Sequence, residues 1–231
     1  MRAIFRCVLA LTGFMFTFSA VYAQKDDYKW EGFVGYSYMN LNRGIDPDEV
    51  NNEIGDFPAN RVNAHGFNGS ITYNFHRYVG AKFDLTFAKH GEDFTSPLQI
   101  SAPPLPPIAA TLKSSQDVEQ YLFGIQIKDN MKDSQKLKPW AHILGGIAHE
   151  KFVIEETAPG AVTIVSNGAN DFAMKLGGGL DLRVHKNVDI RLIQFDWNPI
   201  SRSDITVGGR IGTINSVLQN NYIFTWGVAF H

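Results

Sequence analysis

The side chains of this chain that could do chemistry are charged groups at alternate positions of otherwise apolar segments. In a strand, alternate positions share one face, so these groups would gather on the polar face of each segment. Acids and bases on facing strands could pair around trapped water or line a selective pore. We expect an interior polar plug made by nine residues: Glu31, Lys82, Asp84, Lys128, Lys175, Asp181, Arg183, Asp189 and Arg191.

Two pairs of positions in this set are the first to test: Lys82 with Asp84, and Asp181 with Arg183. Residues two apart on one face need not pair with each other, so we expect their partners on adjacent strands. Removing one member of a buried ion pair leaves an unpaired charge and costs about 3–5 kcal/mol.

Hydrolytic chemistry would need a nucleophile, a base and an orienting acid within hydrogen-bond reach. His142, His149 and Glu150 are the best candidates, but no serine lies beside them and no His-X-Ser unit occurs in the chain. The seven histidines lack metal-ligand spacing, and Gly177-Gly178-Gly179 lies in a strand pattern rather than before a helix. The sequence therefore predicts no catalytic, cofactor-binding or metal site.

The N-terminus has the order of a secretory signal peptide, predicted to be cleaved after residues 1–23. Arg2 and Arg6 flank the start of an apolar run that leads to Val21-Tyr22-Ala23. The run is short for a retained membrane anchor, and Cys7 lies at its start, where a lipoprotein would not have it. Cleavage would leave 19 basic and 23 acidic residues, a net charge of −4, and no cysteine. An acidic balance argues against a nucleic-acid partner.

Period-two alternation of apolar and polar residues recurs through the rest of the chain, where no long apolar helix is expected. It predicts strands over residues 30–40, 66–75, 79–88, 120–128, 140–150, 172–184, 188–197 and 222–230. The two faces of 140–150 are hard to tell apart. The phase slips between Ile193 and Trp197, as a β-bulge would make it.

The connections between these strands alternate in length. Those at 43–63, 89–117, 151–170 and 198–220 are long, and those at 76–78, 129–138 and 185–187 are short. Short turns at one end and long loops at the other are typical of outer-membrane barrels. We therefore expect an all-β, eight-stranded antiparallel up-and-down barrel over 30–231, preceded by a short periplasmic segment at 24–29. Residues 152–165 and 204–214 are expected to form hairpins that continue the strands.

Residue size indicates which face of each strand points inward. An eight-stranded barrel has an interior just wide enough for side chains to fill, too narrow for the bulky faces that include Phe67, Tyr73 and Phe83. The bulky faces should contact lipid, and the faces rich in Gly, Ser, Thr and Asn should fill the lumen. Aromatic girdles are expected at Tyr28, Trp30, Tyr78, Trp140 and Trp226. A lipocalin-like, water-soluble barrel with the reverse orientation is the competing fold.

The chain resembles the small outer-membrane β-barrel proteins of the OmpA transmembrane-domain and opacity-protein type. The resemblance rests on Glu31-Gly-Phe-Val-Gly-Tyr-Ser-Tyr38, Gly69-Ser-Ile-Thr-Tyr-Asn-Phe75 with Tyr78-Val-Gly80, Gly177-Gly-Gly-Leu-Asp181 and the closing strand. It implies a Gram-negative outer membrane, periplasmic chaperones and insertion by the barrel-assembly machinery. No peptidoglycan-binding domain is expected after the barrel. His231 departs from the family, whose members usually finish on the aromatic residue.

The closing strand is expected to act as the assembly signal through its outward face, Tyr222, Phe224, Trp226, Val228 and Phe230. We expect a non-enzymatic monomer with a structural or surface-interaction role and no cofactor. A surface ligand would bind the loops 89–117 and 198–220, and the first of these contains a proline-rich run at 96–108. The alternatives are a small or gated porin-like channel and, less favoured, a lipid-A hydrolase or acyltransferase.

Overall fold

The computed structural model describes residues 27–42, 61–96, 110–132, 135–158, 161–201, 205–207, 212–214 and 218–231. The segment 1–23, expected to be a signal peptide, lies outside them. The described strands are β1 (Trp30–Asn42), β2 (Arg61–His76), β3 (Val79–Ser96), β4 (Ala110–Lys128), β5 (Leu137–Ala158), β6 (Ala161–His185), β7 (Val188–Ser201), β8 (Ile205–Val207), β9 (Gly212–Ile214) and β10 (Leu218–Phe230). In the described part of the chain, no helix is long and apolar enough to span a bilayer.

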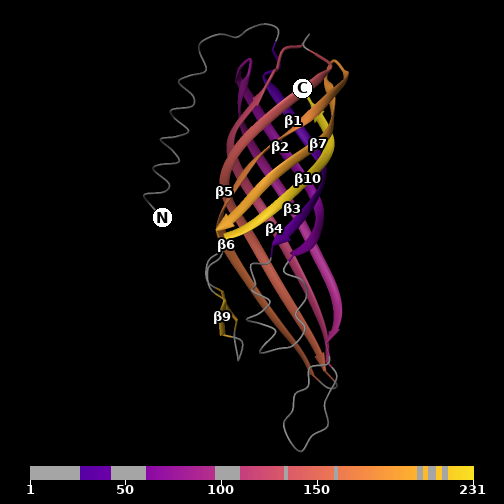
Figure 1. Cartoon of the computed structure of the whole chain (residues 1–231), viewed down its shortest axis with the longest axis vertical. Helices are drawn as coiled ribbons and strands as arrows, with labels where there is room; N and C mark the ends of the chain where they lie inside the picture. Colours follow the sequence, from indigo (N-terminus) through magenta and orange to yellow (C-terminus); the bar gives the residue numbers. More distant parts are fainter. Residues whose placement is uncertain are drawn as a thin grey trace, which may run out of the picture.

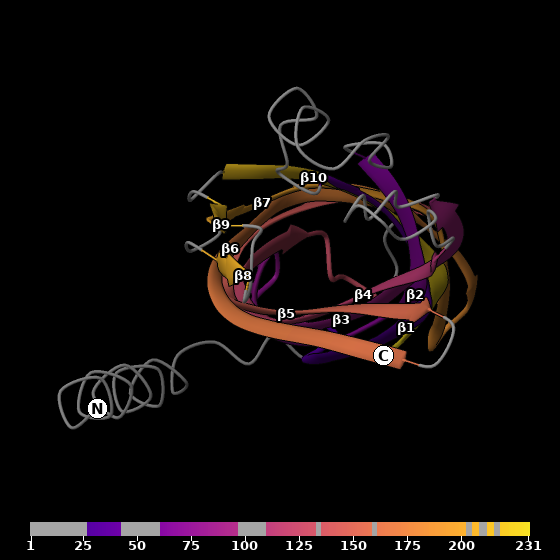
Figure 2. The same ribbon diagram turned by 90° about the horizontal axis from the view of Figure 1, so that it is seen from below.

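Eight of these strands close into a barrel in the order β1-β10-β7-β6-β5-β4-β3-β2. Each strand is antiparallel to its neighbours, and Figure 2 shows the ring that they form. Closure joins the first strand to the last, from Gly32 opposite Phe230 to Asn40 opposite Tyr222. A closed barrel pairs the backbone groups of every strand, which a bilayer requires. The eight-stranded antiparallel fold expected from the sequence is confirmed.

The strands extend further at the long-loop end than the sequence predicts. Residues 89–96 and 110–117, expected in a loop, belong to β3 and β4, which remain paired up to Ser96 opposite Ala110. β5 and β6 likewise pair up to Ala158 opposite Ala161, so the hairpin expected at 152–165 is confirmed. Figure 1 shows these strands reaching beyond the others, opposite the end with the short turns. Pairing continues there because backbone hydrogen bonds do not need alternating side chains.

The hairpin expected at 204–214 forms, but it does not continue the barrel strands. β8 and β9 pair only with each other, from Ile205 opposite Ile214 to Val207 opposite Gly212, in a separate two-stranded sheet.

The large apolar side chains face outward, as residue size predicts. Trp30, Ile71 and Phe172 are 60%, 57% and 59% exposed, respectively. Two expected girdle residues are exceptions, because Trp140 and Tyr28 are buried at 5% and 8% exposure. Trp140 shares its strand face with the inward His142, and the absence of a side chain at Gly179 makes room for its ring.

A β-bulge in β7 reverses the orientation of its side chains. Leu192 and Ile193 both face outward, at 42% and 45% exposure. The pairing with β6 skips Leu192, and in the pairing with β10 both Leu192 and Ile193 lie opposite the single residue Trp226. As a result Arg191 on one side of the bulge and Asp196 on the other both face the lumen. The predicted phase slip is confirmed.

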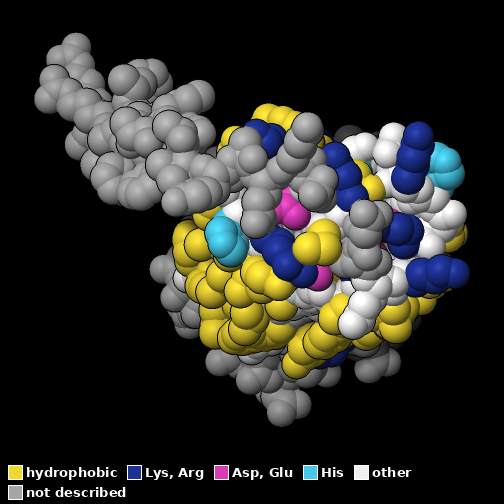
Figure 3. Space-filling view, turned by 90° about the horizontal axis from the view of Figure 1, so that it is seen from above, with side chains coloured by type: hydrophobic (Ala, Val, Ile, Leu, Met, Phe, Trp, Pro, Cys, Tyr) yellow, Lys and Arg dark blue, Asp and Glu magenta, His cyan; other side chains and the backbone are white. Residues whose placement is uncertain are grey.

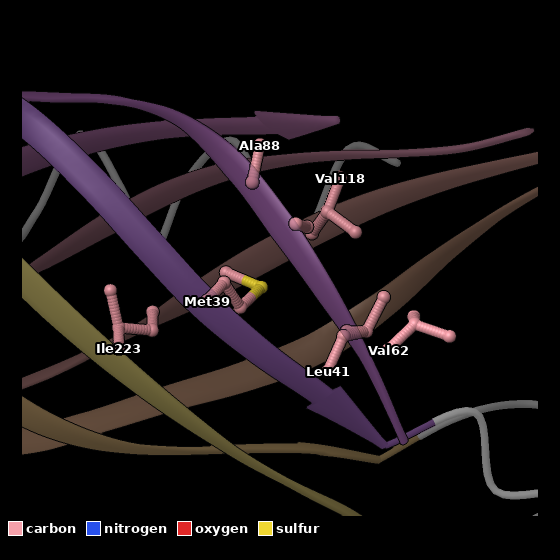
Figure 4. Packing of buried hydrophobic residues seen from close by; sticks show 7 residues of the cluster. Met39, Leu41, Val62, Ala88, Val118 and Ile223 are labelled. Carbon is pink, nitrogen blue, oxygen red and sulfur yellow. The ribbon is translucent and has the colours of Figure 1, made fainter. Parts of the chain in front are cut away.

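The lumen is apolar toward the long-loop end, although the sequence predicted a small and polar inner face. One cluster consists of Met39, Leu41, Val62, Ala64, Ala88, Val118 and Ile223. Figure 4 shows these side chains on several strands, with six of them labelled. A second cluster consists of Leu122, Leu144, Ala148, Ala173 and Ile200. All twelve are at most 5% exposed. Aliphatic side chains can fill so narrow an interior without needing polar partners, so they are stable inside as well as outside.

Candidate functional site

The charged side chains of the lumen form two clusters nearer the short-turn end. The end cluster consists of Glu31, Lys128, Asp181, Asp189 and Arg191. The middle cluster consists of Lys82, Asp84, His142, Lys175 and Asp196. Every one of these ten side chains is at most 3% exposed.

Lys128 is the centre of the end cluster. Its Nζ lies 2.7 Å from Glu31 Oε2, 2.7 Å from Asp181 Oδ2 and 3.6 Å from Asp189 Oδ2. Those carboxylates come from β1, β6 and β7, whereas Lys128 is the last residue of β4. One ammonium group therefore ties together strands on opposite walls of the barrel.

Arg191 is the second cation of the end cluster. Its Nε and Nη2 donate to the two oxygens of Asp181 at 2.8 and 3.1 Å, and Nη2 also lies 3.3 Å from Glu31 Oε1. The guanidinium carbon lies 4.0 Å from the ring centre of Phe33 and 4.1 Å from that of Trp140. A planar guanidinium is suited to two-pronged pairing and stacking at once, which a lysine could not reproduce.

The middle cluster contains a direct ion pair and a three-residue chain. Lys175 Nζ lies 2.5 Å from Asp84 Oδ1, and it donates to Thr86 Oγ1 at 2.8 Å. In the three-residue chain, which begins at Lys82 on the same strand as Asp84, His142 Nδ1 lies 3.2 Å from Lys82 Nζ, and its Nε2 lies 2.9 Å from Asp196 Oδ1.

Opposite charges are closely balanced in both clusters. With Arg183, which pairs with Asp189 at 3.4 Å, the end cluster has three cations and three carboxylates. The middle cluster has two lysines and two aspartates around His142. Buried charges are tolerated when they are paired and hydrogen-bonded. The arrangement therefore links strands across the lumen through paired charges.

Side chains at the short-turn end cover the end cluster. The ring of Tyr28 stacks on that of His231 with centroids 4.3 Å apart, and its hydroxyl donates to the carbonyl of Lys186. Arg183 and Lys138 approach the same ring at 5.3 and 5.7 Å. Figure 3 looks onto this end and shows lysine and arginine side chains around the mouth.

One ion pair joins two of the short turns outside the membrane-spanning strands. Arg77 Nε and Nη2 donate to the carboxylate of Asp129 at 3.2 and 3.3 Å. The hydrogen bond to Asp129 raises the pKa of Arg77. Partial burial alone would raise the pKa of Asp129, but hydrogen bonds from Arg77 and from the Met131 amide lower it overall.

All nine residues expected in the polar plug have their side chains on the inner wall, but several partners differ from expectation. Asp181 with Arg191, and Arg183 with Asp189, join the adjacent strands β6 and β7. Lys175, however, reaches across the lumen from β6 to Asp84 on β3. The interior is narrow enough for long side chains to span it, so pairing is not limited to adjacent strands.

Asp196 and Trp140 were not expected in the plug, and His142 was considered as a candidate for catalysis. The phase slip in β7 was the signal that could have identified Asp196. For Trp140 and His142 the ambiguous faces of β5 left no such signal. Trp140 Nε1 donates to Asp181 Oδ1 at 3.0 Å, so the ring belongs to the end cluster.

The closing strand shows its bulky face to the outside. Tyr222, Trp226 and Phe230 are 36%, 42% and 50% exposed, and Phe224 and Val228 lie on the same face. Recognition of this face by an assembly machinery remains a prediction.

Neither a protein-family model nor a curated protein matches this sequence. Among solved structures, the outer membrane protease OmpT from Escherichia coli is similar with a TM-score of 0.50 and 8% identity, covering 92% of this chain and 99% of OmpT. The chain has the fold of an outer-membrane β-barrel. Neisserial surface protein A aligns with a TM-score of 0.45 and 10% identity, over 88% of this chain and 97% of that protein. Ail, the attachment invasion locus protein of Yersinia pestis, aligns with a TM-score of 0.44 and 13% identity, over 88% of this chain and 100% of Ail.

The two histidines considered for catalysis, His142 and His149, have structural contacts. His142 lies between Lys82 and Asp196, and His149 Nδ1 contacts Asn170 Oδ1 at 2.8 Å on the outer surface. Among the described residues, no group of three or more His, Cys, Asp or Glu side chains could hold a metal ion.

Proposed function

We propose that this protein resides in the outer membrane of a Gram-negative cell as a closed barrel with a structural or surface-interaction role. The observation that carries this proposal is the position of Lys128, buried and bonded to carboxylates from opposite walls of the lumen. A cation shared in this way cross-links the barrel and fills its interior.

The membrane location is supported by the reversed distribution of side chains. The outside carries large hydrophobic residues such as Phe67 and Ile143, at 53% and 51% exposure, while lysines and aspartates are buried. A continuous apolar outer surface would aggregate in water, since soluble proteins rarely expose patches larger than a few hundred Å². The same surface is stable in lipid.

The closed lumen is tested by recording from the purified protein in planar bilayers, with a known porin as the positive control. We expect no unitary conductance at protein amounts at which the porin gives many channels. Regular channel openings by the unmodified protein would contradict the closed-barrel proposal. A heat-dependent shift in gel migration tests the barrel itself, and its absence would contradict the membrane location.

A gated pore is the second candidate, and the multiple partners of Lys128 and Arg191 favour it. Each cation could exchange one carboxylate for another without becoming unpaired. If such exchange opens a path, Glu31→Gln should produce conductance that the unmodified barrel lacks. A Glu31→Gln protein that shows no conductance at any applied voltage would argue against gating.

A lipid-A-modifying enzyme is the least favoured candidate. The one buried histidine of the middle cluster is bonded to Lys82 and Asp196, neither of which is a hydroxyl or thiol nucleophile. We expect lipid A from a deletion strain to be unchanged by mass spectrometry, and an altered acyl or phosphate pattern would revive this candidate. Surface interaction, by contrast, would use the segments 89–117 and 198–220, whose ends are strand residues of β3, β4, β7 and β10.

A further inference from the structure

A row of polar and aromatic side chains crosses the outer surface of four adjacent strands at the long-loop end. On β2, β1, β10 and β7, Asn63 lies opposite Asn40, Asn40 opposite Tyr222, and Tyr222 opposite Trp197. Arg61 lies next to this row, opposite Asn42. We call Arg61, Asn40, Asn63, Asn220, Tyr222 and Trp197 the Arg61 ledge. The four strands lie side by side in the barrel of Figure 1.

Arg61 is exposed, but its position is defined by its neighbours. Nη1 donates to Asn40 Oδ1 at 2.7 Å, and Nη2 donates to the carbonyl of Asn220 at 3.1 Å. Its guanidinium carbon lies 5.3 Å from the centre of the Tyr222 ring. Two of the five N–H donors of the guanidinium are used in this way. With the carboxylates of the described residues, Arg61 forms no ion pair.

The neighbouring polar groups are also held in place. Asn40 Nδ2 donates to Asn63 Oδ1 at 3.1 Å, and Trp197 Nε1 donates to Asn220 Oδ1 at 3.1 Å. The ledge is therefore an ordered polar surface beside a cation, directly above the lipid-facing Phe195 and Phe224. Such order lowers the entropy lost when a ligand binds.

The position and chemistry of the ledge indicate its ligand. Arginine pairs with phosphate through two parallel N–H bonds, and asparagine side chains can bond sugar hydroxyls. Tyrosine and tryptophan suit a site that is apolar at one end and wet at the other. We propose that the Arg61 ledge binds a phosphorylated glycolipid of the outer leaflet, with the phosphate on Arg61 and the sugar over the asparagines. This inference rests on the proposed outer-membrane location.

The test is a titration of the folded protein in neutral detergent, followed by native mass spectrometry. The probes are bisphosphorylated lipid A, its dephosphorylated form and phosphatidylglycerol. We expect lipid A to bind more tightly than either of the other two. Loss of a charge-assisted hydrogen bond in Arg61→Gln should weaken lipid A binding by about tenfold or more.

Lys89→Gln is the matched control, because Lys89 is an exposed cation at the same end of the barrel that pairs with Asp117 at 3.5 Å. We expect it to leave lipid A binding unchanged. Asn40→Ala keeps the charge of Arg61 but removes one of its positioning contacts, so it should give a smaller loss. It also serves as the test if Arg61→Gln fails to fold.

Equal lipid A binding by Arg61→Gln and the unmodified protein would overturn the inference, as would equal binding of the dephosphorylated form. Equally tight binding of phosphatidylglycerol would also overturn the inference, because the site would then select a phosphate group and not a glycolipid. A heat-dependent gel shift shows separately whether each variant still folds into the barrel. Failure at the ledge with a normal gel shift would therefore leave the proposed function standing.

Discussion

Asp196 Oδ1 lies 2.9 Å from His142 Nε2 on the inside of the barrel, although β7 begins in the phase that would point Asp196 into lipid. The bulge at Leu192 and Ile193 reverses that phase, so Arg191 and Asp196 both contribute to the plug. A local irregularity in one strand thus supplies the middle cluster with its second carboxylate.

Replacing Lys128 with methionine should strongly destabilise the barrel. The change keeps most of the side-chain volume but removes one of the two cations, Lys128 and Arg191, that Glu31 and Asp181 share. The expected loss is about 3–5 kcal/mol in the free energy of unfolding, measured by urea titration in lipid vesicles. The exposed Lys89→Met is the control. Equal stability of the two variants would mean that the plug does not hold the barrel together.

Replacing Gly227 with alanine should impair the closure between β1 and β10. A Cβ there would lie 2.2 Å from the carbonyl oxygen of Val34 and 2.9 Å from the ring of Phe33. Overpacking of this kind costs about 1–3 kcal/mol. Gly32→Ala is the matched control, since a Cβ at Gly32 meets nothing within 4 Å. Folding yield in vesicles measures both, and a normal yield for Gly227→Ala would contradict this account.

Deleting His231 tests two roles with one variant. Its Nε2 lies 2.9 Å from Asp189 Oδ2 and its ring stacks on Tyr28, so the deletion should lower stability to urea. If the assembly machinery requires a terminal aromatic residue, the same deletion should speed insertion. An unchanged insertion rate would indicate that the alternation from Tyr222 to Phe230 is recognised instead. Unchanged stability would show that the contacts of His231 are dispensable.

The ion pair of Arg77 with Asp129 should make a small, pH-dependent contribution to stability. The pKa of Asp129 is lowered in the folded protein, so its contribution is present above the unfolded pKa of about 3.9. It is lost as the pH falls through the lower, folded pKa. Asp129→Asn should therefore lower stability at pH 7 and have less effect in strong acid. Urea titrations at both pH values measure this difference, and an equal effect at both would contradict it.

The strand positions, the short turns and the outward face could be predicted because they depend on a local period of two. Trp140 shows where the prediction failed: both faces of its strand are apolar, so alternation could not assign it. The paired extensions of β3 and β4 were missed for a related reason, because the side chains of residues 89–96 and 110–117 no longer alternate beyond the apolar band. Met39 and Leu41 were missed because small polar side chains were expected throughout the lumen.

The sequence by itself determined that the chain forms a barrel and that the nine charged residues of the expected plug face the lumen. Side-chain alternation and residue size, which are properties of each segment, were sufficient for that. Only the tertiary structure decided which charges meet. Lys128 and Glu31 are 97 positions apart in the chain, and Arg191 and Glu31 are 160 apart. Their pairing depends on barrel closure, strand register and the bulge in β7, which together bring distant walls within reach of one side chain.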